Sequence, residues 1–444
     1  MENAYRKSGL VAFALAASAI CAGSARADDA PPSIIDSVPA LAPIGDFKKS
    51  LADHGLTLQM TYIGEVLGNP TGGARQGVVY DGRLDAVLEA DMGKVANLDG
   101  GTIHVEGFWT HGTSLSHNYL TNLLAESYIE ALPTIRLYEL WYEQKLFNDK
   151  LSVRFGQLGA DTDFVASKYA ALFANSTTGW PGVLVSDLPS GGPAYPFASP
   201  GMRAKYDFND NFTYVIGIYD GDPAGPGSND PQLRNRYGVN FRLSDPPLIM
   251  QEAQIKYNQD KDSPGLAGTV KLGAWQHVGA FKDLRYDVTG QPLTSGLPAA
   301  LHGGDYGFYG MIDQQLVKAP SDPTKGLGAF LRVFGAPGDR NVSDFYFDTG
   351  LNLSGFVPGR ANDVAGVSFA YMHISDSAAA AAIDAGSPVR PDYEALLEAT
   401  YQTQIAPGFG VQPVLEYVFH PGARLNGAAT RNALVLGVRS TINF

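Results

Sequence analysis

The chain has 444 residues, of which only 17% are charged, and its formal net charge is −13. Such an acidic chain is poorly suited to a polyanionic partner, so we expect no nucleic-acid binding. Its single cysteine, Cys21, excludes an intramolecular disulfide and a metal site built from several thiolates.

The first residues have the pattern of a secretory signal peptide. Arg6 and Lys7 precede an apolar run that ends near residue 22, and the small-x-small triplet Ala25-Arg26-Ala27 follows. The apolar run is too short for a stable transmembrane helix. We therefore predict a signal peptide over 1–27 and an exported, cysteine-free remainder.

The segment 28–55 precedes the first predicted strand. Ile44, Phe47 and Leu51 have the spacing of one helix face. We predict a short periplasmic helix over 45–53, with a disordered leader as the alternative.

Beyond the signal peptide, several segments alternate between apolar and charged residues. Tyr138, Leu140 and Tyr142 alternate with Glu139, Trp141 and Glu143. Neighbouring side chains of a strand point to opposite faces, so these segments predict strands with one apolar and one polar face. Alternation of this kind fits a soluble sandwich as well as a membrane barrel.

The final segment favours the membrane barrel. Over 432–444, Leu434, Leu436 and Val438 share a face that ends at the terminal Phe444. A terminal aromatic after such a strand is typical of outer-membrane barrels, and we expect Phe444 to be recognised by the barrel assembly machinery. An edge strand of a soluble sandwich is the alternative.

Sixteen strands are predicted. An even number returns both termini to the periplasm, with short turns on that side and longer loops outside. The expected fold is therefore all-β: a 16-stranded antiparallel transmembrane barrel over 56–444, set in outer-membrane lipid and lipopolysaccharide, with an aqueous lumen. The strands are expected at 56–66, 80–91, 102–111, 134–146, 150–158, 201–208, 212–219, 236–257, 267–277, 305–315, 327–335, 345–353, 364–373, 393–404, 411–419 and 432–444.

The connection from Gly159 to Pro200 is unusually long for a loop without regular structure. Its many apolar residues need burial, so we predict that it folds into the lumen and forms the constriction. These residues are Phe164, Tyr169, Leu172, Phe173, Trp180, Val183, Leu184 and Val185.

The inward charges and the loop supply the candidate solute-contacting residues. Aromatic faces can stack on sugar rings, while arginines and carboxylates bond hydroxyl groups. The alternative is that they are paired wall residues, with Trp180 only anchoring the loop. The candidates are Arg83, Glu139, Trp141, Glu143, Arg154, Asp161, Asp163 and Trp180.

A barrel enzyme is the less favoured interpretation. The chain contains neither HExxH nor GxSxG. His104 and Glu106 share a strand face, which we interpret as an ordinary pair of wall residues. We therefore expect no catalysis, no cofactor and no metal.

Stretches along nearly the whole chain resemble the carbohydrate-selective outer-membrane porins of the OprB type. The resemblance implies a 16-stranded porin that passes glucose-like monosaccharides passively. A homotrimer is one of the assemblies that it leaves open. The resemblance also implies an eyelet lined by arginines and acids, in which we place Arg83, Glu139, Arg154 and the start of the long loop, where Asp161 and Asp163 lie. A general or non-sugar porin for anions or small acids is the alternative. The matching stretches are LADHGLTLQMTYIGEVLGN at 51–69, RLYELWYEQKLFNDKLSVRFGQLGADTDF at 136–164, NSTTGWPGVLVSDLPSGGPAYPFASPGMRAKY at 175–206, YDGDPAGPG at 219–227, RLSDPP at 242–247, GAPGDRN at 335–341, YVFHPG at 417–422 and ALVLGVRSTINF at 433–444.

Overall fold

The computed structural model describes residues 32–320 and 322–444, and the predicted signal peptide over 1–27 lies outside these ranges. The described chain contains sixteen strands, as predicted. They are β1 (Leu56–Gly73), β2 (Gly77–Asp91), β3 (Gly101–Gly112), β4 (Thr134–Leu146), β5 (Leu151–Leu158), β6 (Ser199–Asn209), β7 (Phe212–Tyr219), β8 (Leu248–Tyr257), β9 (Gly268–Asp287), β10 (Ala299–Ala319), β11 (Asp322–Gly335), β12 (Ser343–Ser354), β13 (Val364–Ile374), β14 (Tyr393–Ala406), β15 (Phe409–Phe419) and β16 (Arg431–Asn443).

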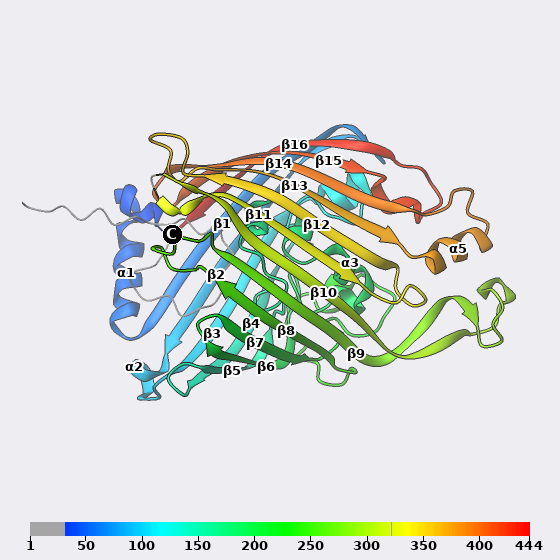
Figure 1. The fold of residues 1–444 in the computed structure, drawn as a ribbon, viewed down its shortest axis with the longest axis horizontal. Helices are drawn as coiled ribbons and strands as arrows, with labels where there is room; N and C mark the ends of the chain where they lie inside the picture. The colour runs from blue at the N-terminus through cyan, green and yellow to red at the C-terminus, as the bar shows by residue number, and fades with distance from the viewer. Residues whose placement is uncertain (1–31, 321) are drawn as a thin grey trace, which may run out of the picture.

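Each strand pairs with its neighbours in sequence, and β1 pairs with β16 to close the barrel (Figure 1). All pairs are antiparallel. At the closing seam Glu65 lies opposite Arg439, and their side chains form an ion pair of 2.8 Å inside the barrel. Closure leaves no sheet edge with unpaired backbone groups, which is the condition for crossing a bilayer with strands.

Alternation along the strands places polar side chains inside and apolar side chains outside. On β5, Arg154 is 1% exposed and its neighbour Phe155 is 51% exposed. On β16, Arg439 is buried and Val438 is 48% exposed. An outward row of large apolar side chains is unfavourable in water and favourable in lipid, so the exposure pattern is that of a membrane barrel.

One predicted strand was too long. The segment 236–247, expected to be part of a strand, is a loop, and β8 begins only at Leu248. Pro246 and Pro247 lack the N–H group that a strand ladder requires, so the strand begins only after them.

The connection predicted over 278–304 is mostly strand. β9 extends to Asp287 and pairs there with Ala299 of β10, so only 288–298 connects them. This hairpin projects beyond the rest of the barrel (Figure 1). Charged residues such as Lys282 and Arg285 interrupt the alternation in this hairpin, so the sequence pattern did not indicate a strand. The backbone hydrogen bonds between β9 and β10 form without an apolar face.

The predicted N-terminal helix is present as α1 (Ala42–Asp53) and begins three residues earlier than expected. It packs against β1, and Lys48 donates a hydrogen bond to the carbonyl of Phe444. α1 and the C-terminus therefore lie at the same end of the barrel (Figure 1). None of the helices among the described residues is long and apolar enough to cross a membrane.

The other helical segments are short and lie in the connections. They are α2 (Met92–Ala96), α3 (Gly182–Asp187), α4 (Pro231–Arg234), α5 (Asp376–Asp384), the π-turn η3 (Ser116–Leu120), and the 3₁₀ turns η1 (Ile34–Ser37), η2 (Pro39–Leu41), η4 (Ala170–Leu172), η5 (Ser176–Thr178), η6 (Pro189–Gly191), η7 (Leu293–Ser295) and η8 (Pro421–Arg424).

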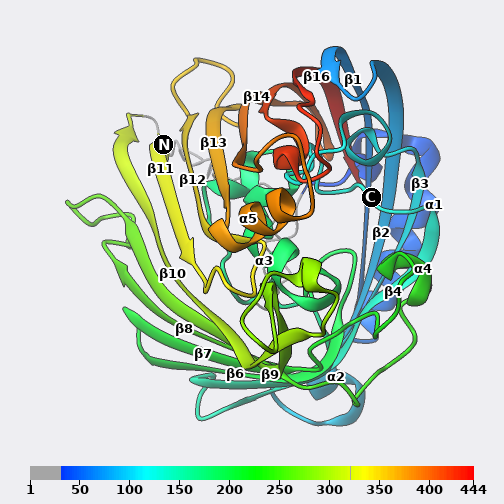
Figure 2. The same ribbon diagram turned by 90° about the vertical axis from the view of Figure 1, so that its right-hand side faces the viewer.

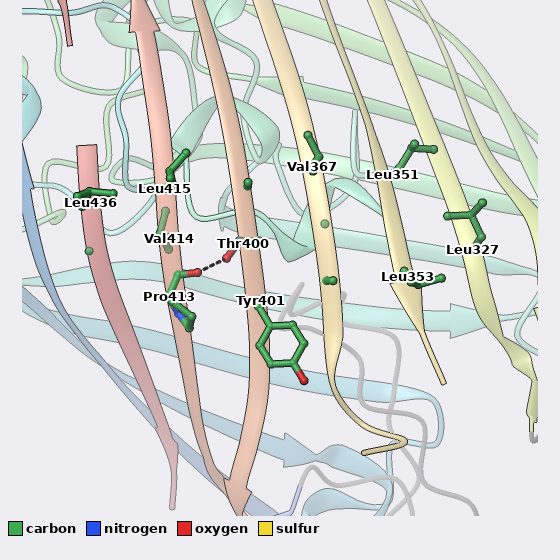
Figure 3. A pocket seen from close by; sticks show the side chains of 14 residues that line it. Leu327, Leu351, Leu353, Val367, Thr400, Tyr401, Pro413, Val414, Leu415 and Leu436 are labelled. Atoms are coloured by element: carbon green, nitrogen blue, oxygen red, sulfur yellow. Dashed lines mark hydrogen bonds between the residues drawn. The ribbon is translucent and has the colours of Figure 1, made fainter. Parts of the chain in front are cut away.

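A shallow apolar groove of about 720 Å³ lies on the outer surface over β11–β16 (Figure 3). Leu351, Val367, Leu415 and Leu436 line it and are among the exposed apolar side chains. Because these side chains point away from the barrel interior, the groove is separate from any passage through the lumen.

Candidate permeation site

The long connection between β5 and β6, residues 159–198, folds into the barrel, as predicted. Figure 2 shows α3, which belongs to this loop, inside the ring of strands. Phe164, Phe173 and Leu184 are at most 1% exposed and pack with inward side chains of the wall. The loop thus fills much of the lumen and narrows the space that remains for solute.

Charged and polar groups of the far wall hold this inward loop in place. Glu252 of β8 accepts a hydrogen bond from Val165 N at 3.0 Å. Glu398 of β14 accepts from the backbone N–H groups of Ala174 and Asn175 at 2.8 and 3.0 Å. Hydrogen bonds to ionised groups are stronger than neutral ones, so each anchor contributes more than an ordinary contact. The other wall anchors are Asp313, Arg332, Asn352, Gln412 and Arg439.

Glycines in the wall make room for the aromatic residues of the loop. A Cβ at Gly328 of β11 would lie 2.0 Å from the ring of Tyr169. A Cβ at Gly366 of β13 would lie 2.5 Å from Leu172 and 2.9 Å from Phe173. Since all three distances are well below van der Waals contact, any larger residue at these two positions would push the loop away.

A second loop, residues 113–133 between β3 and β4, also folds inward, which the sequence did not lead us to predict. Leu115, Leu120 and Leu124 are fully buried. Glu394, on β14, accepts hydrogen bonds from Leu123 N and Leu124 N at 2.8 and 2.6 Å. The run of leucines in this connection was the available signal, because leucines in an exposed loop have nothing to pack against.

The two inward loops and the β2–β4 wall enclose a cavity of about 760 Å³. Its chemistry is mixed, since charged groups and aromatic rings line it together. The charged and aromatic residues of the lining include Arg83, Glu106, Tyr128, Glu130, Tyr138, Asp161, Trp180 and Tyr195.

Arg83 lies at the meeting point of the wall and both loops. Its Nε donates to Asp85 at 2.9 Å. Its guanidinium also lies 4.6 Å from the ring centre of Tyr195 and 5.7 Å from that of Tyr128. Because one tyrosine belongs to each loop, a single cation contacts aromatic groups from both. The Tyr195 hydroxyl donates to the carbonyl of Ile129 at 2.8 Å and links the loops directly.

Carboxylates of the loops face the same space. Asp161 accepts hydrogen bonds from the Tyr138 hydroxyl at 2.9 Å and from Tyr195 N at 3.2 Å. Removal from water raises the pKa of Asp161 to about 6. Burial also raises the pKa of Glu130, which accepts from the Ser114 hydroxyl. These loop carboxylates therefore take up protons more readily than ordinary ones.

Of the eight predicted site residues, Arg83, Asp161 and Trp180 line the cavity. Trp180 is also an anchor, since its indole N–H donates to the carbonyl of Gly191 within the same loop at 3.0 Å. The prediction that these three contact solute stays a prediction.

The other five predicted residues lie outside the cavity lining, within the wall and the start of the loop. Arg154 and Arg203 both pair with Glu143, each at 3.0 Å, and with Asp163 at 3.3 and 3.1 Å. The guanidinium of Arg154 also lies 3.9 Å from the ring centre of Trp141. Two arginines and two carboxylates form a compact, charge-balanced group that joins β4, β5 and β6 to the loop.

Glu139, the last of the five, is 2% exposed and accepts from Trp141 Nε1 at 2.8 Å and from Gly159 N at 2.6 Å. It lies beside a β-bulge, where Glu106 opposes Glu139 and Gly107 opposes Leu137. The extra residue is Tyr138, which points inward, whereas strict alternation placed it on the outer face. A bulge reverses the alternation on one side of it, which explains the difference.

Sequence reasoning missed Glu106, Tyr128, Glu130 and Tyr195 as lining residues. Alternation did place Glu106 on the polar face of its strand. The two tyrosines lie in connections, where no periodic pattern indicates a direction.

The comparisons with known proteins agree with this architecture. Residues 75–444 match the family described as carbohydrate-selective porin, OprB family. Porin B of Pseudomonas aeruginosa is 23% identical over 423 residues, which cover 89% of each chain.

Two solved structures of OprB from Pseudomonas putida share the fold. The high-pH structure is 23% identical, with a TM-score of 0.80, and the match covers 90% of this chain and 97% of that one. The low-pH structure is 18% identical, with a TM-score of 0.55, and covers 90% and 96%. On the match of most of its length to the family model, this chain belongs to the carbohydrate-selective porin, OprB family, and is an outer-membrane channel protein rather than an enzyme.

Proposed function

We propose that this porin lets small carbohydrates, glucose-like monosaccharides among them, diffuse passively into the periplasm through the cavity beside Arg83. The observation that carries the proposal is the position of Arg83 between Tyr128 and Tyr195, with Asp161 on the same cavity. Tyrosine rings offer apolar faces to the C–H side of a sugar, and charged groups bond its hydroxyls. A volume of about 760 Å³ also suits a small solute.

Passive passage is supported by the way the loops are held. The anchors from Glu252, Glu394 and Glu398 are buried and accept backbone N–H groups, so moving a loop would leave buried polar groups without hydrogen-bond partners. A fixed constriction selects by size and lining and needs no energy-driven movement.

The orientation that we propose puts α1 and both termini in the periplasm. Connections at the α1 end include the two-residue turns 210–211 and 407–408, whereas the opposite end carries 113–133 and 159–198. Short turns are typical of the periplasmic side of bacterial barrels. Protease added to intact cells should then cleave only loops of the opposite end.

The proposed partners follow from membership of the outer-membrane barrels. Phe444 would be read by the barrel assembly machinery, lipopolysaccharide would contact the outer apolar band, and the chain would assemble as a homotrimer. Light scattering of the detergent-solubilised protein tests the trimer, and membrane yield of Phe444→Ala tests the terminal signal.

The function is tested by liposome swelling with a panel of sugars, amino acids and anions, together with planar bilayer recordings. We expect glucose to enter liposomes and to reduce the ion current. Equal rates for all solutes of similar size would indicate a general porin, and exclusion of sugars with passage of small acids would indicate a non-sugar porin.

A further inference from the structure

Three side chains with metal-binding atoms converge on the inner wall between β3 and β4. His104 Nε2 lies 3.6 Å from Glu106 Oε2 and 3.7 Å from Glu139 Oε2. One ligand atom from each residue lies within 4.8 Å of the others. All three residues are buried, with exposures of 1%, 7% and 2%.

The imidazole of His104 is oriented for metal binding. Glu89 Oε1 lies 3.1 Å from Nδ1, so in the neutral tautomer with its proton on Nδ1 the Nε2 lone pair is directed at the two glutamates, and a bound cation would take the place of any Nε2 proton. A carboxylate behind a histidine is the usual second layer of a zinc site. Nε2 itself is buried and has no hydrogen-bond partner. The ring also stacks on Trp141, at 4.4 Å and 2° between planes, which fixes its direction.

Charge at this position favours a cation. Three carboxylates, those of Glu89, Glu106 and Glu139, surround one imidazole, so even a protonated His104 leaves these four groups with a net charge of −2. The nearby arginines, Arg154 and Arg203, already balance two other carboxylates. Excess buried charge is costly unless a counter-ion is bound.

We propose that His104, Glu106 and Glu139 bind one divalent transition-metal cation, with Zn²⁺ the best fit to one imidazole and two carboxylates. Donors about 2.1 Å from a tetrahedral ion lie roughly 3.4 Å apart. The observed 3.6 and 3.7 Å separations need only small shifts, and the ligand atoms of Glu106 and Glu139, which lie within 4.8 Å of each other, would move closer together around the ion. Glu106 also lines the cavity, which gives the ion a route of entry and leaves a fourth position for water.

The site joins two strands beside the bulge at Tyr138 and does not depend on which solute the channel passes. No spacing motif predicts it, because Glu139 comes from the next strand and lies opposite Glu106 only once the two strands are paired.

The test uses the full barrel in detergent, stripped with EDTA and then titrated with Zn²⁺ by calorimetry and with Co²⁺ by absorption spectroscopy. We expect one ion per chain and an X-ray absorption spectrum containing a single imidazole. His104→Phe keeps the stacked ring and Glu106→Gln keeps the volume, and each should lose at least tenfold in affinity. Glu89→Ala should lower the Zn²⁺ affinity about 10- to 100-fold, because it removes the carboxylate that holds the His104 ring from behind.

The matched control is His302→Phe, because His302 also contacts two carboxylates, Asp283 at 3.0 Å and Asp339 at 3.8 Å, but on the projecting hairpin side. It should bind Zn²⁺ like the unchanged protein. Circular dichroism confirms that each variant is folded. Stoichiometric binding that survives His104→Phe would overturn the proposal. The proposal would also be overturned if the unchanged protein bound no more Zn²⁺ or Co²⁺ than the folded Glu106→Gln variant. His104 would then serve only as an ion-pair partner.

Discussion

Arg332 and Asp348 form a fully buried ion pair on the inner wall, with Arg332 Nε 2.9 Å from Asp348 Oδ1. The same guanidinium donates to the carbonyls of Val165, Thr177 and Gly179 at 3.0, 2.8 and 3.2 Å. One wall arginine therefore ties two separate parts of the inward loop 159–198. This relationship makes the constriction a part of the folded barrel.

Replacing Arg332 with methionine should loosen the loop. The change removes three bonds to loop carbonyls and leaves Asp348 buried without its partner, a loss of about 3 to 5 kcal/mol in stability. We expect a severalfold larger and noisier single-channel conductance. Arg332→Met combined with Asp348→Leu serves as the control, since it removes the unpaired charge. The double variant should regain stability but keep the enlarged conductance. Conductance equal to that of the unchanged protein in both would refute the anchoring role.

Gly328→Val, on the same strand as Arg332, should push the loop away from the wall. The added side chain would overlap the ring of Tyr169, which lies 2.0 Å from the position of a Cβ. We expect larger conductance and faster sugar entry in liposome swelling. A useful comparison is Gly303→Val, because no atom lies within 4 Å of its Cβ position. Neither Gly303 nor Gly328 has a positive φ, so neither substitution strains the backbone, and the permeability of Gly303→Val should be unchanged.

Ion selectivity should depend on pH through Asp161. Its pKa is raised to about 6, so it is ionised above that pH and neutral below it. Acidification from about pH 8 to about pH 5 therefore removes negative charge from the cavity and should lower the preference for cations. Reversal potentials in a salt gradient measure this. The same raised pKa means that ionising Asp161 costs folding stability. This contribution to stability is full below the ordinary pKa, is lost as the pH rises from there through about 6, and changes no further at higher pH.

Asp161→Asn should abolish most of that pH step. The amide keeps an acceptor for the Tyr138 hydroxyl while lacking the charge. If the change in ion selectivity with pH is the same size in this variant, other carboxylates are responsible for it. Glu130 is the first candidate because it lines the same cavity.

Arg83→Met should weaken sugar block of the current. The substitution removes the cation between the two tyrosine rings but keeps most of the side-chain volume. We expect glucose to block several times less well, with the barrel still closed. Arg390→Met is the comparison, since Arg390 pairs with exposed Asp376 in the connection between β13 and β14. Block that is the same in both variants would remove Arg83 from the solute path.

Much of the barrel followed from the sequence, because alternation depends only on which face meets lipid. The polar face of β4 was predicted at Glu139, Trp141 and Glu143, and all three side chains are buried inside the barrel. The loop 159–198 was predicted to enter the lumen because its aromatic residues require burial. Where charges interrupt the apolar face, as in the projecting part of β9, the prediction was wrong.

The site was harder to predict because an inward residue need not meet water. Arg154 and Glu143 point inward as expected, yet the loop covers them and they form a buried charged group. The second inward loop brings Tyr128 to Arg83, and the bulge turns Tyr138 inward. The first effect depends on contacts between residues far apart in sequence. The second depends on a break in the two-residue alternation of the strand.

The most direct test of the account is chemical modification of one residue in the cavity. Cys21 is the only cysteine of the chain. With it removed, Thr162→Cys places a single thiol in the cavity lining and Ala428→Cys places one on an exposed connection. If solute passes between the β2–β4 wall and the two inward loops, a negatively charged thiol reagent should cut ion current and glucose entry in Thr162→Cys only, and glucose should slow the reaction. Full modification of Thr162→Cys with unchanged current and glucose entry would contradict the account.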